Sequence, residues 1–201
     1  MLYQIALFIH ITGALLLFIA VGLEWLGLNR LRRAERVEQV QEVSALLRVL
    51  GKLFPFSTPL ILVGGLYMAF TVWGFALAWL DAALALVVVM GILGQRVSGP
   101  RMAAIGKMAF TQPHGPLPIG LRERITDPVL VFVTRTTALL TWGIVFLMTV
   151  KPALLGTLAT LGVALVLGLL CARAALQAGR KPTPEPAEQY IQHELSESAR
   201  R

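Results

Sequence analysis

Long apolar stretches alternate with short charged ones along this chain. Five of the apolar stretches approach the length of about 20 residues that an α-helix needs to cross about 30 Å of hydrocarbon. These stretches are residues 2–24, 53–73, 76–97, 128–150 and 152–174. The pattern therefore predicts an all-α polytopic membrane bundle of five transmembrane helices within residues 1–175, followed by a polar tail at 176–201.

The basic residues predict which way the bundle faces. Sixteen of the 18 Lys and Arg residues fall into three stretches that share one side of the membrane once the five runs are threaded through it. Of the other two, Lys151 lies at the opposite surface and Arg135 lies inside the fourth run. Because cytoplasmic loops are enriched in Lys and Arg, we expect the N-terminus outside and the C-terminus in the cytoplasm, in a bacterial inner membrane.

The composition agrees with a membrane location, since 56% of the residues are hydrophobic and only 14% are charged. A soluble domain of this length carries more charge. The topology and the attraction of basic loops to the lipid bilayer account for the net charge of +7, which therefore does not indicate nucleic-acid binding. The single cysteine, Cys171, excludes an intrachain disulfide, and the motifs of soluble enzymes are absent.

The charged segments between the runs carry little chemistry. Residues 29–50 have apolar positions at a helical period, which predicts an extension of the first helix or a helix lying on the membrane surface. Residues 98–126 are rich in Gly and Pro and are expected to form a flexible cytoplasmic loop that holds His114. His114 and His193 of the tail are both expected to be solvated.

Four ionisable residues of the apolar runs are candidates for function, because such groups are costly inside a membrane and mark function. His10 and Asp81 are expected in the outer half of the membrane, and Glu24 and Arg135 in the inner half. An ion pair between Glu24 and Arg135 is predicted, as a structural clamp or a proton path. In the outer half, His10 either bonds to a neighbouring helix or joins Asp81 or a sulfur ligand in a cluster. Asp81 alternatively is hydrated or favours a helix N-terminus.

Small residues predict where helices approach one another closely. Gly64 and Gly65 permit contact in the second helix, and Pro55 and Pro59 predict a kink at its start. The fifth helix carries a four-residue repeat of small side chains, namely Gly156, Thr160, Ala164 and Gly168. This repeat predicts either tight packing within the bundle or a homodimer.

Four segments carry a family resemblance: LFIHITGALLLFIAVGLEWL, GGLYMAF, SGPRMAAI and FLMTVKP. Together they resemble a bacterial family of predicted integral membrane proteins of unknown function, over about residues 1–152. More distantly, the early histidine followed by small residues is similar to the copper-resistance D-type membrane proteins and to the J-type membrane protoporphyrinogen oxidases. Helical bundles of those families bind haem, and the similarity implies that role for His10 alone.

Three classes of function stay open. The first is binding of haem b, or of copper, through His10, with Met68 or Met148 or a second chain supplying another ligand. The second is a small oligomeric transporter in which Glu24, Arg135 and Asp81 line a hydrated path. The third is a non-catalytic scaffold or accessory subunit. Met68 and Met148 equally suit plain packing.

Overall fold

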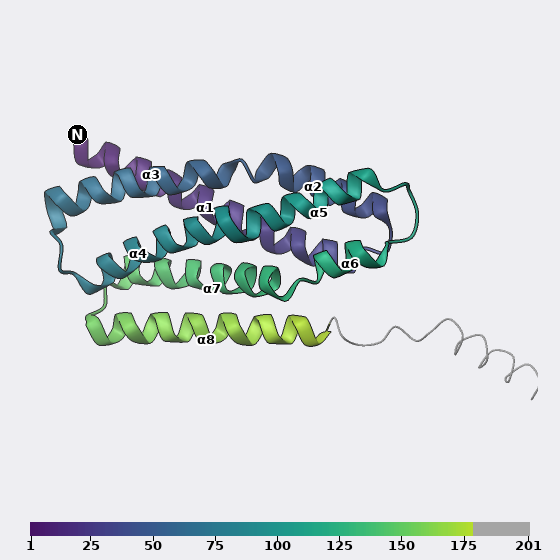
Figure 1. The fold of residues 1–201 in the computed structure, drawn as a ribbon. Helices are drawn as coiled ribbons and strands as arrows, with labels where there is room; N and C mark the ends of the chain where they lie inside the picture. Colours follow the sequence, from purple (N-terminus) through teal and green to yellow (C-terminus); the bar gives the residue numbers. More distant parts are fainter. Residues whose placement is uncertain (179–201) are drawn as a thin grey trace, which may run out of the picture.

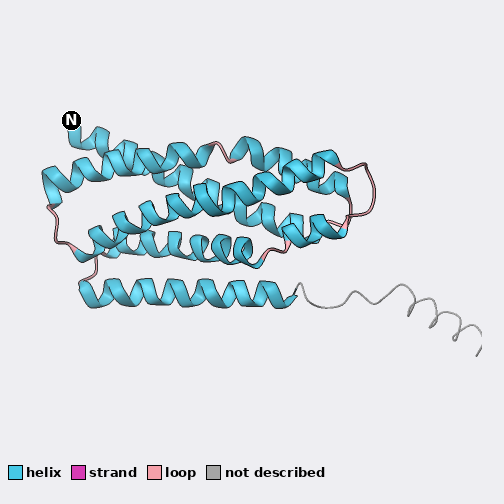
Figure 2. Cartoon of the chain, in the orientation of Figure 1, coloured by secondary structure: helices cyan, strands magenta, loops and turns pink. Residues whose placement is uncertain are grey.

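The computed structural model describes residues 1–178, in which helices follow one another without a β-strand (Figure 2). The helices are α1 Leu2–Arg33, α2 Val37–Leu50, α3 Leu53–Met68, α4 Ala78–Leu93, α5 Gly99–Thr111, α6 Ile119–Ile125, α7 Pro128–Val150 and α8 Leu154–Ala178. Two π-helical turns, η1 Ala69–Trp73 and η2 Gly94–Ser98, continue α3 and α4. The all-α prediction is confirmed. Most of the predicted tail, including His193, lies outside the described residues.

Within residues 1–178, five helical segments are long and apolar enough to span a membrane, as predicted. They are Leu2–Arg33, Pro55–Trp73, Ala78–Thr111, Ile119–Val150 and Leu154–Ala178. They run side by side as a bundle in which α1 lies against α3 and α7 against α8 (Figure 1). Many large apolar side chains stay exposed on the outside of the described bundle, which is typical of helices that face lipid rather than water.

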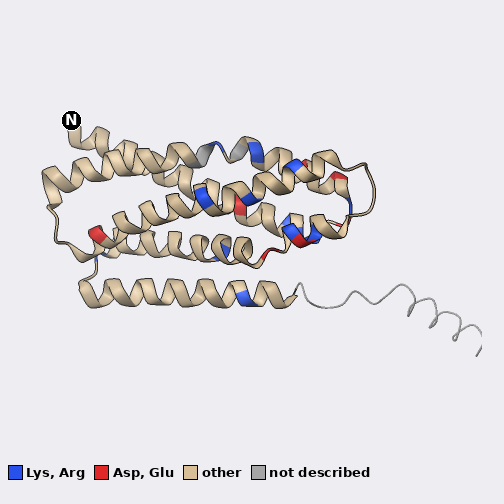
Figure 3. Cartoon of the chain, viewed as in Figure 1, with Lys and Arg blue, Asp and Glu red and all other residues tan. Residues whose placement is uncertain are grey.

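The two ends of the bundle differ in charge. One end, where Arg33, the 112–118 loop and Ala178 lie, holds most of the basic residues of the described chain (Figure 3). We call it the basic end. The opposite end holds Met1, the loop between η1 and α4, and Lys151. The basic residues that the sequence predicted to share one side of the membrane thus lie mostly towards one end of the bundle.

The segment 98–126 is more ordered than predicted. Residues 99–111 form α5 in direct continuation of η2, and residues 119–125 form α6. The Gly and Pro at 99 and 100 do not prevent this, because a proline in the first helical turn loses no intrahelical hydrogen bond. Only the stretch from 112 to 118 is a loop, and it holds His114 as expected.

The basic end has its own apolar core. α1 continues to Arg33, as the first alternative predicted for residues 29–50, and α2 folds back against it. Buried side chains from five helices meet there: Leu28, Leu31, Val40, Ile105, Leu121, Ile125 and Leu130. Backbone hydrogen bonds from Val37 to Gly115 and from Leu117 to Glu35 hold the 112–118 loop against α2. α2 is therefore held beside α1 at this end, and α5 packs against α2.

Small residues bring the helices together as predicted. A Cβ atom at Gly64 of α3 would lie 2.5 Å from the carbonyl oxygen of Ala6 in α1. A Cβ atom at Gly168 of α8 would lie 2.8 Å from Thr136 Cα in α7. Ala164 and Gly168 are buried against α7, so this face packs within the bundle, and nothing in residues 1–178 supports a homodimer through it.

Candidate functional site

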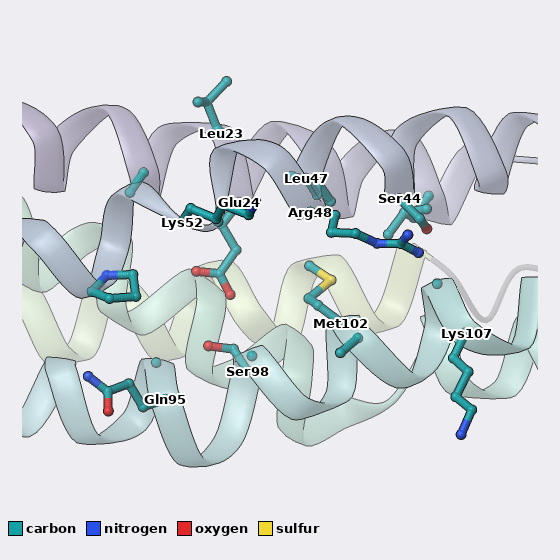
Figure 4. Close-up of a pocket in the computed structure, with 18 of the residues that line it drawn as sticks. Leu23, Glu24, Ser44, Leu47, Arg48, Lys52, Gln95, Ser98, Met102 and Lys107 are labelled. Carbon is teal, nitrogen blue, oxygen red and sulfur yellow. The ribbon is translucent and has the colours of Figure 1, made fainter.

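A cavity of about 740 Å³ lies in the basic half of the bundle. Its walls come from α1, α2, the start of α3, and η2 with α5 (Figure 4). Most of the wall is apolar, with Leu23, Leu47 and Met102 among its side chains. Because α2 folds back from α1 at Ala34 and α5 rises from η2, these two helices diverge from the bundle core and leave this space between them.

Glu24 is the only acidic residue that lines this cavity. It lies on α1, is partly buried, and directs its carboxylate into the cavity towards η2 (Figure 4). The Thr134 hydroxyl of α7 donates to Glu24 Oε1 at 3.4 Å, and the Ser98 hydroxyl also hydrogen-bonds to the carboxylate. Within residues 1–178, Glu24 has no basic partner within ion-pair distance.

The π-helical turn η2 positions Ser98. Its backbone widens so that the N–H of Gly99 donates to the carbonyl of Gly94, five residues earlier. Ser98 at the end of this turn is only 3% exposed and points towards Glu24 (Figure 4). Turns of this kind recur at functional sites, because they change the direction in which side chains point within a continuous helix.

Three basic residues line the cavity on its other walls: Arg48, Lys52 and Lys107. All three are exposed. The Arg48 guanidinium lies over the Phe110 ring at 5.0 Å from its centroid, which links α2 to α5 across the cavity. Lys52 lies in the turn between α2 and α3, close to Glu24 in the view of Figure 4. The cavity thus combines one carboxylate, several cations and an apolar surface.

The predicted ion pair between Glu24 and Arg135 is wrong. Arg135 is buried, donates from Nη2 to Asn29 Oδ1, and places its guanidinium 3.8 Å from the centroid of the Trp25 ring. Thr134 and Arg135 are consecutive on α7, so their side chains point about 100° apart. Thr134 faces Glu24, and Arg135 therefore points to another part of α1, where it meets Trp25 and Asn29.

His10 makes the interhelical hydrogen bond that was one of its two predicted roles. Its Nδ1 lies 2.9 Å from the carbonyl oxygen of Ile61 in α3, and its ring packs on Gly65. A carbonyl oxygen only accepts hydrogen bonds, so Nδ1 is the donor in this one. The structure records no contact of His10 with Asp81, which is exposed in the first turn of α4.

The predicted sulfur ligands lie in packed surroundings. Met68 is 8% exposed at the end of α3, and Met148 packs against the buried cluster of Ala69, Trp79 and Leu80. No hydrogen bond joins either methionine to His10 in the described chain. Nor do any three His, Cys, Asp or Glu residues among those described gather closely enough to hold a metal ion.

The transport alternative placed Glu24, Asp81 and Arg135 on one path, and of these three only Glu24 lines the cavity. Sequence reasoning missed Ser98, Arg48 and Lys52 as cavity residues. The available signal was weak, because basic residues near membrane ends are expected for topology alone. Ser98, Arg48 and Lys52 line one cavity only because α2 folds back from α1 to face η2 and α5.

Comparisons with known proteins yielded no match: no protein-family model, no curated protein and no solved structure resembles this chain closely enough to be significant.

Proposed function

We propose that this chain is a multi-pass protein of the bacterial cytoplasmic membrane that binds an amphipathic ligand in the cavity between α1, α2 and α5. The proposal takes the basic end to be cytoplasmic, in line with the enrichment of Lys and Arg in cytoplasmic loops. The cavity then opens at the depth of the inner leaflet. Its ligand is a molecule with an apolar body and a charged head, as a phospholipid has.

The observation that carries the proposal is Glu24. A carboxylate inside a membrane-spanning helix is costly and is usually paired or functional. Glu24 has two hydroxyl partners but no cation in the described chain, and it faces a cavity rather than packed side chains. The volume of about 740 Å³ falls within the range of small-molecule sites, which are mainly apolar with a few placed polar groups.

The basic residues of the cavity indicate the charge of the head. Arg48, Lys52 and Lys107 outnumber the single carboxylate, so the mouth of the cavity attracts anions. Anionic lipid headgroups at the cytoplasmic surface are attracted by each nearby Lys or Arg with about 1 kcal/mol. An amphipath with a phosphate therefore suits the cavity better than a neutral one.

Binding of fluorescent phospholipids to the purified chain in detergent tests the proposal. The probes are phosphatidylethanolamine and phosphatidylglycerol with an NBD group on an acyl chain, and we expect saturable binding of at least one. Ala103→Trp, which places an indole in the cavity, should weaken binding about tenfold or more. Binding of neither probe, or equal binding by the Ala103→Trp variant, would overturn the proposal.

A matched charge control separates the cavity from the surface. The triple variant Arg48→Ala, Lys52→Ala, Lys107→Ala removes the cavity cations, whereas Arg30→Ala, Arg33→Ala, Arg96→Ala removes three exposed cations outside it. The first variant should lose most of the probe affinity, and the second should lose little. Equal losses would indicate attraction by net charge alone.

A second candidate function is binding of haem b or copper through His10. It is favoured by the hydrogen bond from Nδ1 to Ile61, because histidines that bind metals commonly donate their other ring N–H to a carbonyl. His10 alone supplies one ligand to an iron or copper ion. Met68 or Met148 as a second ligand remains a prediction from the sequence. A Soret band in haemin-loaded protein that is lost in His10→Ala would support this function, and a colourless loaded protein would contradict it.

A further inference from the structure

The carboxylate of Glu24 has unused capacity to accept hydrogen bonds. A carboxylate offers about four acceptor positions, and the hydroxyls of Thr134 and Ser98 occupy two. Both donors are neutral, so they do not cancel the charge of the carboxylate. The carboxylate itself points into the cavity (Figure 4). A cationic N–H donor on the ligand would complete this site.

Lys52 lies at the same depth as Glu24 on another wall. α3 and α4 are antiparallel, and they meet where a Cβ atom at Gly91 would lie 3.4 Å from Thr58 Cγ2. Six residues back from Thr58, about 9 Å, lie Lys52 and the start of α3, and seven residues onward from Gly91, about 10 Å, lies Ser98 of η2, which bonds to Glu24. Lys52 and Glu24 therefore flank one level of the cavity without pairing with each other.

The other two cations lie further towards the basic end. Arg48 Nη2 is 3.9 Å from the position that a Cβ atom would take at Gly106, eight residues beyond Ser98. Eight helical residues span about 12 Å. Lys107 follows Gly106 and lies at that level too. Of the three cavity cations, Lys52 alone shares a level with Glu24.

We propose that the cavity recognises phospholipids whose headgroup ends in a primary ammonium, as in phosphatidylethanolamine, with Glu24 accepting the ammonium and Lys52 binding the phosphate. The two charges of this headgroup are two carbons apart, which matches an acid and a base from two neighbouring segments at one level of the cavity. The inference rests on the proposed function, since it names the head of the proposed amphipath. Apolar walls such as Leu47 and Met102 accommodate an acyl chain.

Without Glu24, the cavity would discriminate poorly between phospholipid headgroups. Phosphatidylglycerol presents a phosphate but no cation. Phosphatidylcholine carries a quaternary ammonium, which has charge but no N–H to donate and is bulkier. A charged hydrogen bond to a carboxylate therefore distinguishes the primary ammonium from both. Lys52 contributes to all three, because each contains the same phosphodiester.

The test is displacement of the bound NBD phospholipid by short-chain dihexanoyl lipids. In the wild-type chain, the phosphatidylethanolamine should displace the probe at about one tenth of the concentration that phosphatidylcholine needs. Stepwise N-methylation of the headgroup should raise the required concentration at each step. This series uses the wild-type chain and so does not depend on the folding of any variant.

Variants then assign the two contacts. Glu24→Gln should bring phosphatidylethanolamine and phosphatidylcholine to within about twofold of each other, because the amide is neutral and the two lipids have the same net charge. Lys52→Ala should weaken all three lipids alike and keep the preference for ethanolamine. Arg33→Ala removes an exposed cation outside the cavity, so it should leave both the affinities and the preference close to those of the wild type and serves as the control.

The outcomes distinguish the inference from the proposed function. Probe binding with no preference among the three lipids in the wild-type chain would overturn the inference while the proposed function stands. A preference that survives in folded Glu24→Gln would overturn the assignment to Glu24. Failure of every lipid probe to bind would overturn the proposed function itself.

Discussion

The guanidinium of Arg135 lies 3.8 Å from the centroid of the Trp25 ring, deep between α7 and α1. An arginine at this depth needs a partner, and here an aromatic face and the amide oxygen of Asn29 supply it in place of a carboxylate. This arrangement leaves Glu24 free of any arginine in the described chain. Glu24 has no ion-pair partner in the described chain because Arg135 contacts Trp25 and Asn29 instead.

Replacement of Trp25 should destabilise the bundle through Arg135. We expect Trp25→Leu to lower the free energy of unfolding by about 1–2 kcal/mol, because the desolvated cation loses its ring. Trp25→Phe should lose less, since a smaller aromatic face remains. SDS titration of the protein in mixed micelles, followed by circular dichroism, measures both. Equal losses for the two variants would mean that the ring does not support Arg135.

A methyl group at Gly64 should force α1 and α3 apart. The Cβ atom of Gly64→Ala would lie 2.5 Å from a backbone oxygen of Ala6, which cannot rotate away. We expect a loss of about 1–3 kcal/mol in the same SDS titration. Gly162→Ala on α8 is the control, because no atom lies within 4 Å of its Cβ position. Its stability should stay close to that of the wild type.

Asp127 holds the start of α7 in two ways, and two substitutions separate them. Its Oδ1 accepts from the N–H of Val129 at 2.8 Å, and its Oδ2 pairs with Arg101 Nε at 3.0 Å. Asp127→Ala should cost about 1–2 kcal/mol, mostly from the lost helix cap. Asp127→Asn keeps a capping oxygen and should cost less than about 1 kcal/mol, as the ion pair is partly exposed. A larger loss in the asparagine variant would show that the ion pair dominates.

Stability should fall at acidic pH through Glu38 of α2. Hydrogen bonding to its own backbone N–H and then to Arg36 holds the pKa of the Glu38 carboxyl below its ordinary value of 4.5. The folded state therefore favours the ionised form, and this stabilisation is present above pH 4.5 and lost as the pH falls through the lowered pKa. The melting temperature of Glu38→Gln should depend less on pH between about 6 and 3 than that of the wild type.

Glu42→Gln controls for net charge in this experiment, since it removes one acid from the exposed side of the same helix. If both variants flatten the pH dependence equally, the local contacts of Glu38 are not the cause.

The chain could be assigned to five spanning helices from its sequence, because each run carries its own evidence of length and hydrophobicity. Close contacts at Gly64 and Gly168 were also predictable, since small residues recur at helical spacing. The helical state of residues 99–111 was not. There a Gly and a Pro in the first turn look like a break in the sequence, although they suit a helix start.

The depth of Glu24 and Arg135 was predictable, because the rise per residue is the same in every helix. Their partners were not, since a partner depends on the direction in which a side chain points around the helix. Thr134 and Arg135 are consecutive on α7, and their side chains point about 100° apart around the helix. Thr134 therefore contacts Glu24, whereas Arg135 contacts Trp25. Hydropathy and charge along a chain determine which segments enter a membrane, but only the packing of α1, α2, α5 and η2 decided that Glu24 and Lys52 share a cavity.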